Sequence, residues 1–184
     1  MTPIEQPAGR GPVVLGSALF LILAAGIGAG FVPWWISHWK VRAPLLGVPL
    51  LRALGAFFIA YGMIVVVDSF ARFALQGLGT PAPVFPTRRL VVTGFYRYVR
   101  NPIYLGAVAV IFGEGLILGN VYVLTYGVLA WLGTHGFVVA YEEPTLRETF
   151  GAEYDAFRSS VPRWLPRLRA WNPDQRGHSD RATE

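Results

Sequence analysis

Two polar clusters in this sequence carry residue types that could bind a charged small molecule. The first, residues 94–106, runs from a basic loop into an apolar stretch and includes Arg100 and Tyr104. The second is the acidic pair Glu142 and Glu143, at the end of a later apolar stretch. An arginine beside a helix N-terminus can hold an anion, and a carboxylate pair can hold hydroxyl groups or balance a cation.

The first cluster has the features of a helix start. Asn101 is a typical N-cap residue, and Pro102 suits the first helical turn because its missing N–H would have no partner there. The plain alternative is a segment that only enters a membrane, with its arginines and tyrosines as interfacial anchors. The position of the acidic pair decides between these two interpretations.

The composition indicates a membrane protein of one domain. The chain has 184 residues, of which 53% are hydrophobic and 15% charged, and it contains 21 glycines. This is too apolar and too rich in glycine for an ordinary soluble domain. It contains no cysteine, which excludes disulfides and thiolate chemistry, and its three histidines lack metal-ligand spacing, so we expect no metal site. A nucleic-acid interface is disfavoured because no basic face with interleaved aromatics lies outside the apolar stretches.

The apolar stretches predict an all-α integral membrane protein with about four transmembrane helices. Residues 1–12 are expected to be disordered, and a cleaved signal peptide is the alternative interpretation of the first helix. Within that helix the glycine-rich residues 26–30 lack a preceding strand, so they indicate close helix packing rather than a dinucleotide site. The predicted spans are residues 13–35, 45–67 with the helix continuing to 76, 102–118 and 121–141.

The last two spans must form a hairpin, because only Gly119 and Asn120 separate them. Their antiparallel packing places Asn101, Pro102 and Tyr104 beside residues 141–143. Two motifs about 40 residues apart thus meet at one membrane face, as the rise of an α-helix requires. At the end of the second span, Asp68 and Arg72 lie four residues apart and are expected to pair.

The distribution of Lys and Arg predicts the topology. With four spans, one side of the membrane carries 13 basic residues, among them Arg72, Arg100 and seven arginines in residues 147–181. The other side carries three, Lys40, Arg42 and Arg52. The positive-inside rule therefore places both termini and both polar clusters in the cytoplasm.

After Pro144 the sequence predicts an amphipathic helix interrupted at Gly151, with a polar tail over residues 172–184. This helix is interpreted as an interfacial anchor or as a lid over the open end of the hairpin, and the two roles are compatible. We expect Glu114, flanked by glycines inside the third span, to be a structural acid hydrogen-bonded to Tyr122 or Tyr126. We expect His135 to be a satisfied buried histidine rather than a catalytic one.

These motifs resemble a known family of membrane enzymes. Arg100-Asn-Pro-Ile-Tyr-Leu-Gly106, then Glu142-Glu-Pro-Thr-Leu146, Phe150-Gly-Ala-Glu-Tyr154 and Val161-Pro162 resemble the signatures of isoprenylcysteine carboxyl methyltransferase-like proteins. Tyr141-Glu-Glu-Pro144 is also similar to phosphatidylethanolamine N-methyltransferases. The similarity covers about residues 79–167, whereas residues 1–78 match only as membrane helices.

The resemblance implies a methyltransferase that binds S-adenosylmethionine at the cytoplasmic end of the hairpin, under the C-terminal helix. It also implies a lipid or small apolar methyl acceptor. The carboxyl methyltransferases have His at the position of Asn101, and an Arg before the acidic pair that is absent from residues 137–141 here. Asn101 fits the lipid and bacterial members, which suggests a bacterial inner membrane. Carried over, the catalytic residues are Arg100, Tyr104, Glu142 and Glu143, and the cofactor-binding residues are Arg88, Arg89, Leu90, Val91, Tyr96, Asn101, Pro102, Ile103, Tyr104, Glu142 and Glu143.

Two other functions stay open at this point. A membrane reductase of similar architecture would bind NADPH, whose extra phosphate Arg88 and Arg89 could hold. A non-catalytic membrane scaffold would use both motifs only to fix helix ends.

The expected organisation is two membrane helices in residues 13–78 followed by a catalytic core in residues 79–171.

Overall fold

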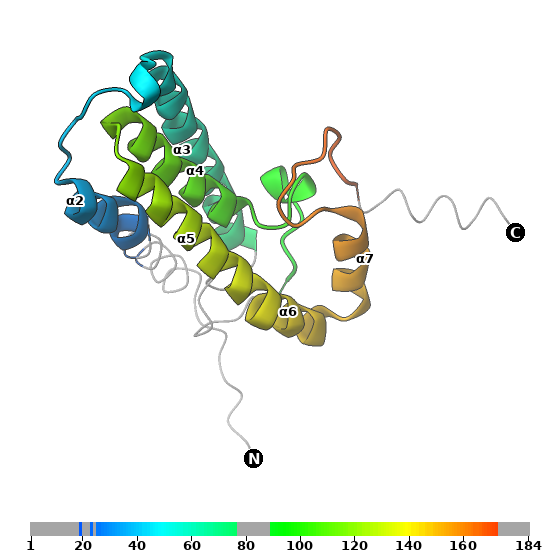
Figure 1. The fold of residues 1–184 in the computed structure, drawn as a ribbon. Coiled ribbons are helices and arrows are strands. Elements are labelled where there is room, and N and C mark those ends of the chain that lie inside the picture. The colour runs from blue at the N-terminus through cyan, green and yellow to red at the C-terminus, as the bar shows by residue number, and fades with distance from the viewer. Residues whose placement is uncertain (1–18, 20–22, 24, 77–88, 173–184) are drawn as a thin grey trace, which may run out of the picture.

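The computed structural model describes residues 19, 23, 25–76 and 89–172, and it is all-helical over these residues (Figure 1). The predicted disorder of residues 1–12, most of the first span, Arg88 and the polar tail beyond residue 172 lie outside the described residues. The elements are η1 (Ile27–Phe31), α2 (Val32–Ser37), η2 (Leu45–Gly47), α3 (Leu50–Gln76), η3 (Gly94–Arg97), α4 (Pro102–Leu118), α5 (Val121–Phe137), η4 (Val138–Glu142), α6 (Glu143–Phe150) and α7 (Ala152–Ser160).

Two helical rods are long and apolar enough to cross a membrane, Leu50–Arg72 and Val121–Phe150. The second rod joins α5, a π-helical turn (η4) and α6 without a break, so the helix predicted to end at Tyr141 runs on to Phe150. Helix α4 is a shorter apolar helix with the predicted bounds. The start predicted for the second span was wrong, because residues 45–47 form a separate 3₁₀ turn and α3 begins at Leu50.

Helices α3 and α4 pack through glycines, which we call the glycine seam: Gly55 against Gly113, and Gly62 against Gly106. A Cβ at Gly55 would lie 2.7 Å from the Gly113 carbonyl oxygen, and one at Gly113 would lie 2.6 Å from the Gly55 carbonyl. The backbones therefore touch, as small residues allow in membrane helices. The earlier glycine of α3 meets the later glycine of α4, and the later one meets the earlier one, so the two helices are antiparallel. They lie side by side in Figure 1.

The predicted hairpin between α4 and α5 is confirmed at its tip. Gly119 has φ +62°, the left-handed conformation that glycine adopts without strain, and ends α4. The buried Asn120 side chain caps α5, because its Oδ1 accepts from the N–H groups of Tyr122 (3.0 Å) and Val123 (3.4 Å). The preceding loop closes onto this tip, where the Arg42 N–H donates to the Leu118 carbonyl (2.9 Å).

Two expectations about the interior of the bundle were wrong. A Cβ at Gly26 or Gly30 would meet nothing within 4 Å, so close packing in residues 26–30 is limited to Gly28, whose carbonyl accepts from the Tyr126 hydroxyl (2.8 Å). That hydroxyl is therefore directed to the backbone rather than to Glu114. Among the described residues the buried Oε2 of Glu114 has no hydrogen-bond partner.

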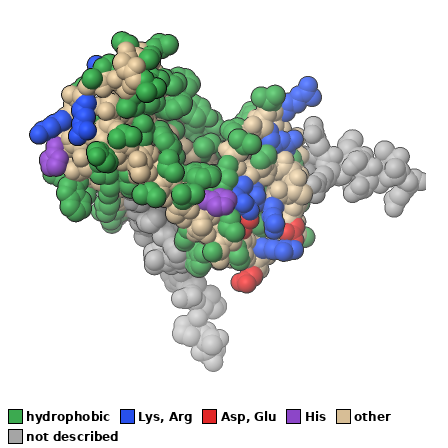
Figure 2. All heavy atoms as spheres, viewed as in Figure 1, with side chains coloured by type: hydrophobic (Ala, Val, Ile, Leu, Met, Phe, Trp, Pro, Cys, Tyr) green, Lys and Arg blue, Asp and Glu red, His purple; other side chains and the backbone are tan. Residues whose placement is uncertain are grey.

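The C-terminal part turns away from the bundle at Gly151, as the sequence predicts. Helix α7 buries Tyr154 and Phe157, which form a small core with Val161, and Leu90 and Trp171 pack against this core. Figure 2 shows hydrophobic side chains over the bundle and charged side chains of both signs around α6 and α7. In this view the acidic side chains lie at this end of the molecule, whereas Lys, Arg and His side chains occur at the opposite end as well.

Candidate functional site

The open end of the hairpin brings the two polar clusters together, as predicted. The Tyr104 hydroxyl, in the first turn of α4, donates to Oε2 of Glu142 at 3.0 Å. We call Tyr104, Glu142 and Glu143 the hairpin mouth. Glu142 closes the π-helical turn η4 and Glu143 begins α6. A π turn inserts one residue into a helix and is frequent at functional sites, and here it sets the directions of the two glutamates.

Glu143 is held by two arginines. Arg163, from the segment after α7, donates from Nε to Oε1 (2.6 Å) and from Nη2 to Oε2 (2.9 Å). Arg100 adds an ion pair from Nη1 to Oε1 at 3.0 Å. The side chains of Arg100 and Glu143 are each 9% exposed. The ion pairs are therefore largely buried, and Arg163 binds Glu143 in the bidentate geometry that makes charge-assisted hydrogen bonds strong. Both Glu143 oxygens are therefore engaged by the protein itself.

Arg100 also links the hairpin mouth to α7. Its Nη1 lies 3.2 Å from the Tyr154 hydroxyl. Burial raises the pKa of Tyr154, and the negative charge of Glu143 raises it further. The Nε–H of Arg100 is buried and has no hydrogen-bond partner among the described residues. An unpaired buried guanidinium N–H is costly, so it is available to an anionic ligand.

Asn101 does not cap α4 with its side chain, which corrects the sequence-based expectation. Its amide Nδ2 instead donates to the backbone carbonyl of Arg163 at 3.3 Å. The backbone N–H of the preceding residue, Arg100, donates to the Pro162 carbonyl (2.9 Å). Asn101 therefore acts as a donor that fastens the segment after α7 to the start of α4, while Pro102 is fully buried at the first helical position.

The other predicted cofactor-binding residues lie around this centre in different environments. Tyr96 is buried in η3, and burial raises its pKa well above the ordinary value, with the charge of Glu142 adding to the effect. Val91 is buried and Leu90 packs on the α7 core, so their side chains face protein. Ile103 is half-buried and Arg89 is exposed. Arg88 lies outside the described residues.

Sequence reasoning missed two residues of this site, Arg163 and Tyr154. Arg163 follows the Val161-Pro162 motif and Tyr154 ends the Phe150-Gly-Ala-Glu-Tyr154 motif, but nothing in their spacing predicts contact with residues far back in the chain. His135 is satisfied, as expected, because its Nδ1 accepts from the Trp164 indole N–H at 2.9 Å. That bond ties the segment after α7 to α5.

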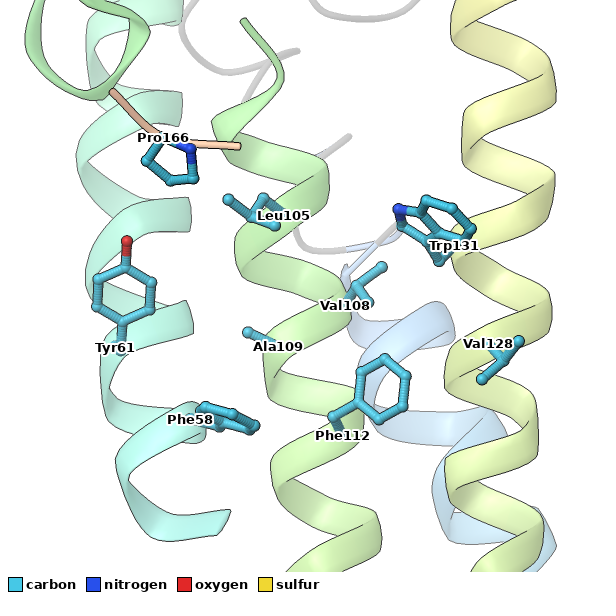
Figure 3. A pocket seen from close by; sticks show the side chains of 9 residues that line it. All are labelled: Phe58, Tyr61, Leu105, Val108, Ala109, Phe112, Val128, Trp131 and Pro166. Atoms are coloured by element: carbon cyan, nitrogen blue, oxygen red, sulfur yellow. The ribbon is translucent and has the colours of Figure 1, made fainter. Parts of the chain in front are cut away.

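An apolar groove of about 460 Å³ runs along α4 between α3 and α5 (Figure 3). Leu105, the neighbour of Tyr104, and Pro166 lie at one end of it, and Trp131 projects into it from α5 (Figure 3). Its volume is in the range of small-molecule and lipid sites. The remaining lining residues are Phe58, Tyr61, Val108, Ala109, Phe112 and Val128.

Comparison with known proteins agrees with this arrangement. The family model for phospholipid methyltransferases matches residues 50–153, from the start of α3 into α7. Phosphatidylethanolamine N-methyltransferase of Laccaria bicolor is 34% identical over 121 residues, which are 64% of this chain and 13% of that protein. Protein-S-isoprenylcysteine O-methyltransferase of Schizosaccharomyces pombe is 35% identical over 78 residues, which are 42% of this chain and 33% of that protein.

The chain thus spans at most a third of the length of either of these curated relatives. The family match, in contrast, covers more than half of the chain and includes the glycine seam, the hairpin and the hairpin mouth. By their names, the two relatives are methyltransferases that act on different acceptors. The chain therefore belongs to the phospholipid methyltransferase family.

Proposed function

We propose that this protein is an integral membrane methyltransferase that uses S-adenosylmethionine and methylates a lipid or small apolar acceptor at the cytoplasmic face. The observation that carries the proposal is the half-buried Glu142 carboxylate, held by Tyr104 beside an apolar groove. A polar centre that opens onto an apolar groove suits a reaction between a charged cofactor and a greasy acceptor. Membership in the family gives the reaction class.

The residues present fit the cofactor. The amino-acid end of S-adenosylmethionine carries a carboxylate, and the unpaired buried Nε–H of Arg100 is a donor for such a group. The ribose carries hydroxyl donors, and the sulfonium carries a positive charge. The Glu142 carboxylate can accept hydrogen bonds from the ribose hydroxyls or balance the charge of the sulfonium. Tyr104 and Glu142 thus form one side of the proposed site and Arg100 the other.

The two glutamates have different roles in this proposal. Both oxygens of Glu143 are engaged by Arg163 and Arg100, so Glu143 positions the segment after α7 and orients Arg100. Glu142 accepts from Tyr104 through Oε2, which leaves its other oxygen available to a ligand. When bound, the cofactor supplies a methyl group activated by its sulfonium. The protein aligns the acceptor with that group and excludes water from the hairpin mouth.

The acceptor enters through the groove. Its lining is apolar apart from the Tyr61 hydroxyl and the Trp131 N–H, which favours hydrocarbon chains over a soluble metabolite. A lipid lying in the groove would direct its polar head toward the end at Leu105 and Pro166 (Figure 3). This arrangement admits an amine, a carboxylate or a thiol as the methylated group.

Cytoplasmic orientation is tested by labelling cysteines from one side of intact cells. The chain has no cysteine, so Lys40→Cys in the loop after α2 and Glu148→Cys on α6 give single exposed thiols. The proposal expects a membrane-impermeant maleimide to label position 40 in intact cells and position 148 only after lysis. Labelling of position 148 from outside would reverse the proposed orientation.

Cofactor identity is tested by calorimetry on the purified protein in detergent. Titration with S-adenosylmethionine is expected to show one binding site and titration with NADPH none. Glu142→Gln should weaken S-adenosylmethionine binding at least tenfold, about 1.4 kcal/mol, without changing the melting temperature appreciably. Binding of NADPH alone would favour a reductase, and unchanged affinity in Glu142→Gln would remove Glu142 from the site.

A further inference from the structure

The segment that follows α7, residues 162–171, exposes two leucines to an unusual degree. Leu168 is 101% exposed and Leu165 is 78% exposed, so their side chains contact almost no protein. Scattered exposed leucines are ordinary on protein surfaces. Here, however, they lie three residues apart in a segment that contacts the groove through Pro166.

The exposure of these leucines does not come from a loosely held chain. Backbone N–H groups of Arg167 and Trp171 donate to the carbonyls of Tyr98 (3.0 Å) and Arg97 (2.9 Å). The Trp164 indole donates to His135, as described above. The segment therefore directs backbone hydrogen-bonding groups toward the protein and its leucine side chains away from it. Exposing leucine side chains to water in this way is unfavourable.

The charges around the leucines match a phospholipid surface. Arg169 is exposed and Arg167 is half-buried, and these two arginines bracket Leu168. Trp164 and Trp171, both half-buried, occur in the same ten residues. Leucine side chains with flanking arginines and tryptophans are the residue types that sit at the boundary between headgroups and acyl chains.

The position beside the groove selects lipid over a second protein copy as the occupant. Pro166 lies between Leu165 and Arg167 and closes one end of the groove, next to Leu105 (Figure 3). Leu132, which follows the groove residue Trp131 in α5, is also exposed (50%). A surface that is continuous with a lipid-facing bundle and carries cationic side chains at its rim complements phospholipid headgroups.

We propose that residues 162–171 form an interfacial anchor, in which Leu165 and Leu168 insert into the phospholipid monolayer and the exposed Arg169 contacts headgroup phosphates. Arg167 holds the segment in place, because its Nη1 donates to the Ser160 carbonyl (2.7 Å). Insertion places the end of the groove at the level of the acyl chains, so that a membrane lipid reaches the hairpin mouth without crossing water. The anchor depends on the C-terminal segment alone. It goes beyond the proposed methyl transfer.

The proposal is tested by single-cysteine fluorescence in this cysteine-free chain. Leu165→Cys and Leu168→Cys are labelled with bimane in the full-length protein and reconstituted into phosphatidylcholine vesicles. Quenching by a phosphatidylcholine carrying a nitroxide near the headgroup is compared with quenching by aqueous iodide. Glu148→Cys, exposed on α6, serves as the water-facing control, and Phe57→Cys, 60% exposed on α3, as the lipid-facing control.

The anchor predicts that both leucine positions are quenched by the nitroxide lipid and are about threefold or more less sensitive to iodide than position 148. Quenching like that of position 148 would show the segment in water and overturn the proposal. Protection from both quenchers would show cover by protein and would also overturn it. Neither the readout nor its failure depends on cofactor binding, so the proposed methyl transfer would stand in either case.

Discussion

The glycine seam joins α3 to α4, the hairpin mouth joins α4 to η4 and α6, and the two regions hold the fold by opposite means. In the seam, Gly62 and Gly106 bring two backbones into contact, and the packing depends on shape alone. At the hairpin mouth, Glu143 joins Arg100 and Arg163 from two distant segments through charge. The seam leaves no room for an added atom, whereas beside the hairpin mouth the buried Nε–H of Arg100 has no partner in the described part of the chain.

This difference separates stability from function. A dry, close-packed seam stabilises the helix pair and offers nothing to a ligand. The hairpin mouth joins α4 to η4 through one hydrogen bond and fastens the C-terminal segment through Glu143, so we expect it to contribute less to the bundle than the seam does. It also keeps polar groups available to a ligand. We therefore expect changes in the seam to unfold the protein and changes at the mouth to alter binding and local order.

The largest effect is expected for Gly62→Val in the seam. Its Cβ would collide with the Gly106 carbonyl oxygen and lie 2.9 Å from Cγ2 of Val110, and a backbone contact cannot move aside. Destabilisation by about 3 kcal/mol or more is expected, at the upper end for overpacking. Thermal melting in detergent measures it. Gly133→Ala on α5, where an added Cβ meets nothing within 4 Å, is the matched control, and an equal loss there would refute the steric explanation.

A smaller effect is expected for Glu143→Gln at the hairpin mouth. The change leaves Arg100 buried without its counter-ion, and breaking buried ion pairs costs about 3–5 kcal/mol. We expect about 2–3 kcal/mol, since Arg163 is 28% exposed in its side chain and water can replace part of its contact. Hydrogen exchange should show the loss in residues 162–171 and not in α3 or α4.

The exposed ion pair between Arg147 and Asp155 is the control for that charge effect. Its side chains are 61% and 45% exposed, so Asp155→Asn should change stability by less than about 1 kcal/mol. If Asp155→Asn and Glu143→Gln gave the same exchange pattern, Glu143 would not have the special role assigned to it.

Apart from the control at Asp155, the smallest effect is expected for Asn101→Ala. The change removes one hydrogen bond, from Nδ2 to the Arg163 carbonyl, which is worth about 0.5–1.5 kcal/mol. Asn101→Asp should cost more than Ala, because a carboxylate would face that carbonyl without a proton to donate. The melting temperatures of both variants measure this order. If Asn101→Asp were as stable as the wild type, Asn101 would act as a helix cap and not as a donor to the Arg163 carbonyl.

Features set by local geometry could be predicted from the sequence. A two-residue turn leaves the third and fourth spans one way to pack, and the rise per residue then places Tyr104 beside Glu142. The pairing of Asp68 with Arg72 (2.8 Å) follows from four-residue spacing on a helix. The break at Gly151 was predicted from the residue type, and the structure shows this glycine at a φ of +50°, a conformation that favours glycine.

Features set by long-range contacts could not be predicted. Arg163 lies in a segment without helical or strand periodicity, so nothing places it on Glu143 before the chain is folded. The π turn η4 changes the directions of Glu142 and Glu143 without a signal in residue types. Asn101 has the residue type of an N-cap, but tertiary structure offers it the Arg163 carbonyl instead.

Transfer of a radioactive methyl group tests the central claim most directly. The protein is reconstituted with bacterial phospholipids and supplied with S-adenosylmethionine labelled in its methyl group. The account predicts label in the lipid extract, loss of most of that label in Glu142→Gln, and a melting temperature in this variant close to that of the wild type. If the wild type transferred no label to lipid or apolar acceptors, or if Glu142→Gln transferred it at the wild-type rate, the assignment of the hairpin mouth as the methyl-transfer site would be contradicted.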